Sequence, residues 1–312
     1  MTLKTLANGL VVPYEEPQAA PDWQVCAASF LASYRNANTR NNYAIALRAW
    51  FAWCRQKGLD PLLSVKRTHI ELWMRQMEEQ EGKSVHTVVH RLNALSGYYR
   101  TAVLDGYIEG SPCAYVRRPR IERVSKTAYL TRVELGQIIE LAEKRSSRDC
   151  AIVCLLGLNG LRVSEVVGID IEDISRERGY KTIFIRRKGD KTQTIPLSHR
   201  TAWAIEQIVK DETAGPLFQS LRTPGKRLSR GDVQRLVKRY AEWVGVRGKS
   251  ISPHSFRHSF VTLSLDAGVS ARDVQNSAGH ADARMTAYYD RNRESLARNA
   301  THQLTAFVEG AI

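Results

Sequence analysis

Apolar residues recur every three or four positions over long stretches of this chain, which is the spacing of one face of an α-helix. The clearest example carries Tyr43, Ala46, Leu47, Trp50 and Cys54. Thr39 precedes this pattern and is expected to cap the helix, and Gly58 stands where the helix should end. The pattern therefore predicts one amphipathic helix between these two residues.

Two further helical segments follow. The first places three apolar residues on one side, namely Ile70, Met74 and Met77. The second is expected to begin at Ser84 and to end near Gly106. Since the helical pattern already begins near Trp23, residues 22–108 are expected to form a small all-helical domain of four short helices.

Proline and charge mark the segments on either side of this domain. Residues 1–21 are polar, contain three prolines and are expected to form an extended N-terminal arm that is too short to fold alone. Residues 109–129 are rich in Arg and Lys and are expected to form a basic linker. A second domain, residues 130–312, is expected to open with a helix in which Thr131 and Glu134 match a capping box.

One segment of the second domain has a different period. Residues 180–197 alternate β-branched and polar side chains on either side of KGDK, 188–191. This pattern predicts a β-hairpin with both lysines at its tip. The predicted fold class is therefore mostly α with a small β-sheet or hairpin, in which a helical domain precedes a mixed α/β domain.

The charge balance narrows the choice of partner. The 312-residue chain carries 46 Lys and Arg against 32 Asp and Glu, a formal net charge of +14, and its isoelectric point is about 9.7. Globular chains this basic most often bind a polyanion, usually nucleic acid. Composition alone leaves open a basic protein with no particular partner.

Cysteine usage and hydropathy argue against several classes of protein. The five cysteines are scattered, odd in number and form no CxxC pair, which argues against a disulfide framework and a structural zinc site. The longest apolar run, residues 151–158, is too short to span a bilayer. No signal peptide is visible at the N-terminus. We therefore expect a reduced, cytoplasmic protein without membrane contact or bound metal, associated with the nucleoid when it binds DNA.

The second domain contains side chains suited to the transfer of a phosphodiester without metal. Guanidinium forks bind the charge on phosphoryl oxygens, lysine or histidine can protonate a departing sugar oxygen, and a tyrosine can hold the phosphate as an ester. Each residue alone has an ordinary explanation as a surface or packing residue. In chain order the set is Arg162, Lys188, His254, Arg257, His280 and Tyr289. The residues alone leave open whether Tyr288 or Tyr289 is the nucleophile.

Several stretches resemble the tyrosine recombinases of the phage integrase family. The close matches are GLRVSEVVGIDIEDI (160–174), IRRKGDKTQTIPL (185–197) and residues 252–291, which contain HSFRHSF and GHADARMTAYYDR. Residues 38–62 and 88–113 match more loosely. The resemblance covers roughly residues 22–300. It implies a two-domain DNA clamp, formed by a helical core-binding domain and a mixed α/β catalytic domain.

The resemblance implies roles for the cationic residues by position. Arg162 and Arg257 look like the two arginines that hold the scissile phosphate. Lys188 falls where the family has its hairpin lysine, which protonates the leaving 5′ oxygen; Lys191 is a neighbour that can be confused with it. An Arg-Arg pair precedes Lys188 in place of a glycine turn, a departure that removes no catalytic group.

The same resemblance implies roles for the histidines and tyrosines. His254 matches the first family histidine, a candidate proton acceptor for the nucleophile, and His280 matches the second, a donor to a non-bridging oxygen. Tyr289 matches the nucleophile, whereas Tyr288 is interpreted as a packing or DNA-side neighbour. Ala278 stands where the family often has leucine.

The implied activity is site-specific DNA recombination. Such an enzyme cuts one strand, forms a 3′-phosphotyrosine and a free 5′ hydroxyl, and needs neither ATP, metal nor cofactor. It works as a homotetramer on two double-stranded recombination sites, with a Holliday-junction intermediate, and is open to control by an accessory directionality factor. Integration or excision of a phage or mobile element is the preferred task. The alternatives are a Xer-like resolvase of chromosome or plasmid dimers, a type IB topoisomerase-like enzyme and a catalytically silent DNA-binding relative.

Further basic residues are candidates for DNA contact, although any of them can simply be solvated. These candidates are Arg40, Arg91, Arg117, Arg118, Arg120, Arg230, Arg235 and Lys238. Two more basic residues of the linker, Arg123 and Lys126, are candidates as well. The C-terminal tail is expected to form a helix with apolar residues Leu296, Leu304, Phe307 and Val308. The resemblance leaves open whether this helix packs on its own chain or is donated to a neighbouring subunit.

Overall fold

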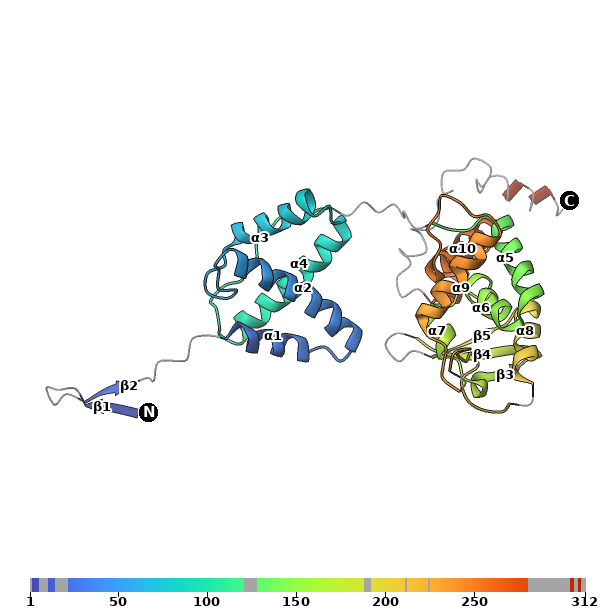
Figure 1. Cartoon of the computed structure of the whole chain (residues 1–312), viewed down its shortest axis with the longest axis horizontal. Coiled ribbons are helices and arrows are strands. Elements are labelled where there is room, and N and C mark those ends of the chain that lie inside the picture. Colours follow the sequence, from blue (N-terminus) through green and yellow to red (C-terminus); the bar gives the residue numbers. More distant parts are fainter. Residues whose placement is uncertain are drawn as a thin grey trace. The chain divides into compact units, whose positions relative to one another are not determined.

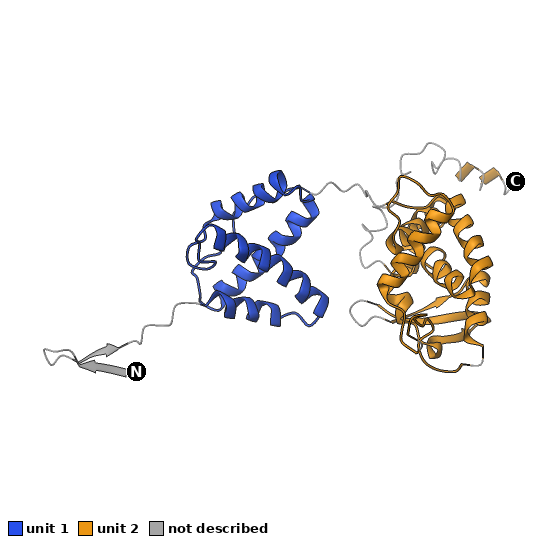
Figure 2. Ribbon diagram, in the orientation of Figure 1, with its two compact units in different colours: residues 1–122 blue, residues 123–312 orange. Residues whose placement is uncertain are grey.

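The computed structural model describes residues 22–120, 128–187, 192–210, 212–223 and 225–279, with short pieces at 304–305 and 308–309 and the backbone of two N-terminal strands. The chain divides into two compact units, unit 1 (residues 1–122) and unit 2 (residues 123–312), as coloured in Figure 2. Each unit has a hydrophobic core of its own.

The N-terminal strands β1 (Thr2–Thr5) and β2 (Val11–Tyr14) form an antiparallel pair, with Thr2 opposite Tyr14. The sequence pattern indicated only an extended arm for this segment. The pairing was not predicted.

The described core of unit 1 is all-helical. Its helices are α1 (Trp23–Ala32), α2 (Ala37–Gln56), α3 (Arg67–Arg75) and α4 (Val85–Leu104), and a π-helical turn, η1 (Gln76–Gln80), extends α3. The helices are labelled in Figure 1. Two of them, α2 and α4, are each 20 residues long and therefore exceed the short helices expected. The predicted start at Ser84 is confirmed, because its side chain caps α4.

The predicted start of α2 at Thr39 is wrong. The helix begins at Ala37, and Asn36 is the N-cap residue. The Asn36 side-chain oxygen accepts hydrogen bonds from the backbone N–H groups of Asn38 (2.9 Å) and Thr39 (3.2 Å). Asparagine is at least as good a cap as threonine, so both positions could have started the helix.

Aromatic side chains fill the core of unit 1. Trp50 and Tyr99 are fully buried, and Trp50 Nε1 donates to the Tyr99 hydroxyl at 3.2 Å. The Tyr99 hydroxyl in turn donates to the carbonyl of Pro61 at 2.7 Å. Burial of these polar tips is tolerated because each has a partner. Beyond α4, residues 112–115 form a turn, and Cys113 and Val116 pack against this core.

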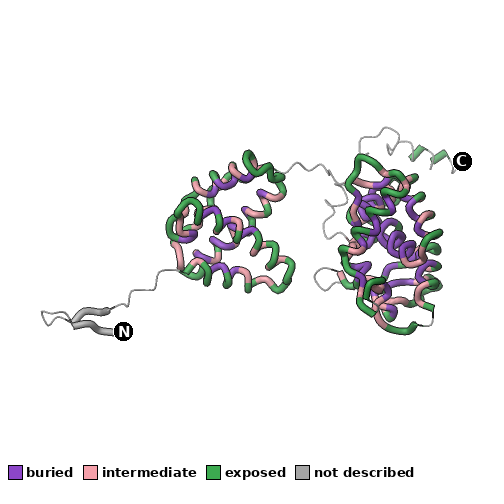
Figure 3. Tube along the Cα trace, in the orientation of Figure 1, coloured by how far each residue is buried: buried purple, intermediate pink, exposed green. Residues whose placement is uncertain are grey.

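Unit 2 is built around a buried helix. The helices are α5 (Arg132–Arg145), α6 (Ser147–Gly157), α7 (Val163–Gly168), α8 (His199–Val209), α9 (Arg230–Trp243), α10 (Pro253–Asp266) and α11 (Ala271–Ala278). Every residue from 149 to 157 on α6 is buried, and α5, α8, α9 and α10 all contact this helix. Figure 3 shows the buried positions concentrated inside the unit. The predicted capping box of Thr131 and Glu134 is confirmed at the start of α5.

A small antiparallel sheet completes unit 2 and confirms the predicted fold class. Its strands lie in the order β3 (Ile174–Glu177), β4 (Tyr180–Arg186) and β5 (Thr192–Pro196), preceded by the 3₁₀ turn η2 (Ile171–Asp173). The β4–β5 hairpin is confirmed, with Arg186 opposite Thr192 as the last pair before the tip. Its tip, including Lys188 and Lys191, lies outside the described residues. Strand β3 was not predicted, because one half-buried isoleucine and three exposed residues produce no alternation.

Candidate active site

The turn between α6 and α7 presents Arg162. Gly160 in this turn has φ 64°, and a Cβ atom there would collide with the ring of Phe260, so glycine is required. Arg162 is the N-cap residue of α7. Its backbone N–H donates to Glu165 Oε2 and its Nη1 donates to Glu165 Oε1, both at 2.8 Å. The buried Glu165 carboxylate thereby orients the Arg162 guanidinium.

Helix α10 presents His254 and Arg257, three residues apart on one face. The helix starts directly before them because the Ser252 side chain caps it. Only 3% of Arg257 is exposed, and its Nη1 donates to the carbonyl of Gly160 at 2.5 Å. Its Nη2 donates to the carbonyl of Ala278 at 2.6 Å. Since a buried charge needs partners, Arg257 connects α10 to both the α6–α7 turn and the end of α11.

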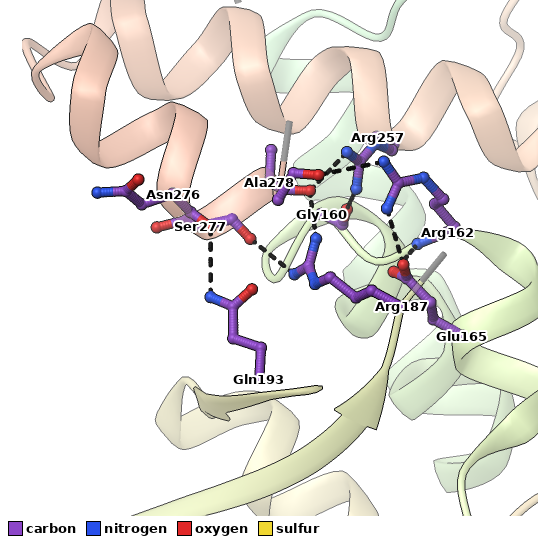
Figure 4. A network of polar contacts seen from close by, with 10 residues as sticks. Gly160, Arg162, Glu165, Arg187, Gln193, Arg257, Asn276, Ser277 and Ala278 are labelled. Atoms are coloured by element: carbon purple, nitrogen blue, oxygen red, sulfur yellow. Dashed lines mark hydrogen bonds and ion pairs between the residues drawn. The ribbon is translucent and has the colours of Figure 1, made fainter. Parts of the chain in front are cut away.

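The C-terminal end of α11 receives these arginines (Figure 4). A helix leaves its last carbonyl groups without intrahelical donors, and they carry partial negative charge. Gly279 ends the helix in the left-handed conformation, with φ 62°. Its carbonyl accepts from Arg162 Nη2 at 3.3 Å, and the carbonyl before it accepts from Arg257. Both arginines therefore meet at two successive carbonyls, directly before His280.

A third arginine belongs to the same cluster. Arg187 follows β4, and its Nη1 donates to the carbonyl of Ala278 at 2.5 Å. Its Nη2 donates to the carbonyl of Ser277 at 3.1 Å. On the neighbouring strand, Gln193 Nε2 donates to the carbonyl of Asn276 at 3.2 Å. Figure 4 shows both hairpin side chains pointing toward the last turn of α11.

The charges of this cluster shift two pKa values. Partial burial, followed by the positive charges of Arg257 and Arg162, lowers the pKa of the His254 imidazole from its usual 6.5. Burial also lowers the pKa of Arg187; the Glu165 carboxylate opposes this shift, and the nearby Arg162 adds to it. An arginine remains protonated in proteins. The cluster is therefore cationic, with His254 biased toward its neutral form.

The structure brings three of the six predicted catalytic residues into one place. Arg162 and Arg257 donate to adjacent carbonyls, and their positive charges act on His254. Lys188, His280 and Tyr289 lie outside the described residues, as do Lys191 and Tyr288. Two of these three are nevertheless the next residues along the chain from described members of the cluster: Lys188 follows Arg187, and His280 follows Gly279.

Sequence reasoning missed Arg187, Glu165 and Gln193 as members of the site. The signal for Arg187 was present, because an Arg-Arg pair stands where the family has a glycine turn. Glu165 lies three residues after Arg162, a spacing at which an N-cap residue and a helical carboxylate pair. No local pattern marks Gln193, since its acceptor lies 83 residues further along the chain.

Two candidate DNA-binding arginines of unit 1 are partly buried. Arg40 Nη1 donates to the carbonyls of Tyr34 (2.7 Å) and Arg35 (2.8 Å). Arg91 lies on α4, and its Nη1 is 3.8 Å from Glu81 Oε2. These contacts engage part of each guanidinium, and the proposed contact with DNA stays a prediction for both residues.

The basic residues after α4 differ in their contacts. Arg118 Nη2 donates to Ser96 Oγ at 2.7 Å, and its Nη1 donates to Asn93 Oδ1, so its side chain lies along α4. Arg117 and Arg120 are exposed. Positions 123 and 126, the remaining basic residues of the predicted linker, lie outside the described residues. DNA contact by this segment also stays a prediction.

Three candidates lie on the exposed side of α9 in unit 2. Arg230 is exposed at the start of the helix. Arg235 pairs with Asp232 at 2.5 Å, and Lys238 lies 3.8 Å from Glu242. Exposed pairs of this kind are weak, so these side chains remain available to a stronger polyanionic partner.

The described residues contain neither a metal-ligand group nor a helix that could cross a membrane. In the described parts of both units, no three His, Cys, Asp or Glu side chains gather as a metal-ligand group. None of the helices in these parts is both long and apolar enough to cross a bilayer. All five cysteines are free thiols, and four of them are buried.

Comparison with known sequences identifies relatives of both units. The chain matches the family model for the Phage integrase family over residues 128–295 and that for the phage integrase N-terminal SAM-like domain over residues 28–106. Tyrosine recombinase XerC of Thermodesulfovibrio yellowstonii is 32% identical over 225 residues, which are 67% of this chain and 72% of the relative. Tyrosine recombinase XerD of Pseudomonas aeruginosa is 30% identical over 263 residues, or 81% and 86%.

Solved structures share the fold at lower identity. The Tn1549 transposon integrase in complex with transposon right end DNA aligns over 91% of this chain and 99% of that chain, with 23% identity and a TM-score of 0.69. A lambda integrase dimer bound to a COC′ core site aligns over 87% and 77%, with 20% identity and a TM-score of 0.69. Since the family match spans more than half of the sequence and the named relatives are covered over most of their length, this chain belongs to the phage integrase family of tyrosine recombinases.

Proposed function

We infer that this tyrosine recombinase exchanges DNA strands at specific sites through a 3′-phosphotyrosine intermediate. The observation that carries the inference is the convergence of Arg162 and Arg257 beside a histidine with a lowered pKa. Two guanidinium groups can bind the non-bridging oxygens of one phosphate and stabilise the charge of the transition state. His254, largely neutral at physiological pH, can accept a proton.

The proposed cleavage step balances without an external reagent. The Tyr289 hydroxyl attacks the phosphorus, so that a bond forms from its oxygen to phosphorus while the bond to the 5′ oxygen of the next nucleotide breaks. The phenol proton passes to His254, and Lys188 donates a proton to the leaving oxygen. His280 donates a hydrogen bond to a non-bridging oxygen. One phosphate ester replaces another, and attack by a 5′ hydroxyl from a partner duplex reverses the step.

The proposed assembly is a homotetramer that holds two double-stranded recombination sites. The net charge of +14 and the exposed basic residues of α9 support binding to DNA. Relatives of similar fold have been solved with DNA, among them the lambda integrase dimer on a core site. We expect the protein to be cytoplasmic, associated with the nucleoid when bound to DNA, and open to control by an accessory directionality factor.

The biological task has two candidates. Integration or excision of a phage or mobile element is the first, and the similarity in fold to the Tn1549 transposon integrase is compatible with it. Resolution of chromosome or plasmid dimers is the second, favoured by the XerC and XerD relatives at 30–32% identity. A plasmid with two directly repeated sites separates the two tasks from simple relaxation of supercoils, because only recombination changes the size of the product circles.

The first prediction concerns covalent capture. The wild-type protein, mixed with a nicked duplex that carries its site and with EDTA, should form a protein–DNA adduct, because the short strand released at the nick cannot return to reverse cleavage. The adduct is measured by denaturing electrophoresis, and peptide mapping should place the phosphate on tyrosine. A strictly metal-dependent adduct, or cleavage without any adduct, contradicts the proposed function.

A second prediction concerns pH. Because the folded-state pKa of His254 lies below 6.5, its neutral form persists at pH values where an exposed histidine is already protonated. The rate of adduct formation should therefore decline only below pH 6.5 as pH falls, and stability should decline in the same window because the unfolded chain binds the proton more readily. Rates of adduct formation measured across pH at limiting protein and duplex, which report the pKa values of the free enzyme, test this prediction. The variant His254→Asn should lose this pH dependence, and a decline of the wild-type rate centred above pH 6.5 rules the assignment out.

A further inference from the structure

The end of α11 is held from the side of the β-hairpin as well as by the two arginines discussed above. Four successive residues, 276–279, offer their carbonyl groups at this end, and each accepts a hydrogen bond from a side chain of another element. Arg187 supplies two of these bonds and Gln193 one. Side-chain capping by cations is favourable here, because the carbonyl end of a helix carries partial negative charge.

The two hairpin side chains come from opposite strands at the same end of the hairpin. Gln193 lies on β5 opposite Ile185, and Arg187 is the residue that follows β4. Together they bind three consecutive carbonyls, so the hairpin is tied to α11 through both of its strands. A connection through two strands resists both rotation and sliding of α11 past the hairpin.

The contact is specific for the residues present. The planar guanidinium of Arg187 reaches two carbonyls at once, which a lysine ammonium on a single stem cannot match in geometry. Any side chain at Gly279 would collide with this guanidinium. Burial beside Arg162 lowers the pKa of Arg187, and the Glu165 carboxylate offsets the repulsion. These contacts hold the Arg187 guanidinium in one position at the end of α11.

We propose that Arg187 is a positioning residue, which with Gln193 clamps the β4–β5 hairpin to the C-terminal end of α11. The hairpin leads directly into Lys188 and α11 leads directly into His280, so the clamp fixes the two chain segments that deliver these groups. Arg187 touches neither the phosphate nor the nucleophile in this proposal. The proposal rests on the proposed function for its catalytic consequence, but the clamp itself is a property of the protein alone.

The clamp is tested first without DNA, by amide hydrogen exchange of the full-length protein. Arg187→Ala should speed exchange in the last turn of α11 by about tenfold, because the loss of two hydrogen bonds makes local opening easier. Gln193→Ala should have a smaller effect in the same peptide. Arg186→Ala is the matched control, since it removes an equal charge from the exposed neighbouring residue and should leave exchange unchanged. Unchanged exchange in Arg187→Ala overturns the clamp, whatever the enzyme does.

The catalytic consequence is tested by cleavage of the nicked duplex at saturating protein. Arg187→Ala should lower the single-turnover rate by about 10- to 100-fold, as misplacement of catalytic groups does. Affinity for the duplex and its salt dependence should match those of Arg186→Ala, because no phosphate contact distinguishes the two variants. If Arg187 were instead a phosphate ligand, the slope of log affinity against log salt would fall by about 0.9 relative to the control.

Failure of the clamp and failure of the proposed function give different results. If the wild-type protein forms no adduct, the recombinase mechanism fails, while the exchange result still decides the clamp. Loosened exchange with cleavage within about twofold of wild type overturns the positioning role, since a rate effect of that size is within about 0.4 kcal/mol. If Arg187→Ala lowers the melting temperature strongly, the milder variant Gln193→Ala replaces it, since Gln193 is only half-buried. This variant should also lower the cleavage rate and leave the affinity for the duplex unchanged.

Discussion

Replacing Tyr289 by phenylalanine should abolish the covalent adduct with the nicked duplex, with a loss in cleavage rate of about 10⁴-fold or more. Phenylalanine keeps the ring and its packing but has no oxygen to attack phosphorus. Binding to the duplex should remain, because the phenol is one group among many that contact the DNA. Denaturing electrophoresis measures the adduct, and electrophoretic mobility under native conditions measures binding.

Tyr288→Phe is the matched control for this variant. The two tyrosines are adjacent, so Tyr288→Phe removes the same phenol oxygen one residue away. This variant should keep most of the wild-type cleavage rate. The histidine-to-tyrosine spacing of nine residues, carried over from the family resemblance, is what selects Tyr289. An adduct that survives in Tyr289→Phe and disappears in Tyr288→Phe would assign the nucleophile to the neighbour.

Features governed by local sequence were predictable. The capping box of Thr131 and Glu134 was recognised because both partners lie within one helical turn. The hairpin was recognised because β-branched and polar residues alternate in β4 and β5, and only five residues separate the two strands. In each case a pattern of a few residues determines the structure.

Features governed by competition or distance were not predictable. Asn36 and Thr39 are both good caps, and sequence alone does not say which one wins. Strand β3 has a single half-buried residue and exists because β4 supplies its hydrogen-bonding partner. The contacts of Arg187 join residues about 90 positions apart, and their acceptors are backbone carbonyls. Since every residue has a carbonyl group, no residue type in the sequence marks these acceptors.

The arginine cluster contains two residues that the family resemblance selected and one that it did not. The resemblance selected Arg162 and Arg257 from motifs 95 residues apart, and the structure brings both to the last carbonyls of α11. The same comparison treated the arginines before Lys188 as a minor departure, whereas the structure gives Arg187 two bonds within the cluster. A resemblance identifies site residues that the whole family shares. The structure is needed to identify site residues that are particular to this chain, such as Arg187.

Arg257→Lys should lower the cleavage rate by about 10²–10³-fold, the effect of removing one well-placed donor to a charged transition state. Lysine keeps the charge, but it cannot reach the carbonyls of Gly160 and Ala278 and still present a rigid pair of donors to a phosphate. The variant should also lose about 1–3 kcal/mol of unfolding free energy, because a buried carbonyl is left without its donor. Single-turnover cleavage and denaturant unfolding measure the two effects.

Lysine is a better test than alanine at this position. With only 3% of Arg257 exposed, alanine would leave a cavity and would remove the side-chain donor of the buried Gly160 carbonyl, so that loss of folding would obscure the loss of activity. Arg272→Lys, the same exchange at an exposed site on α11, is the matched control and should change neither quantity. If Arg257→Lys cleaves at nearly the wild-type rate, or loses cleavage only in proportion to DNA affinity, Arg257 is not a transition-state ligand and the cluster serves only to hold α11 in place.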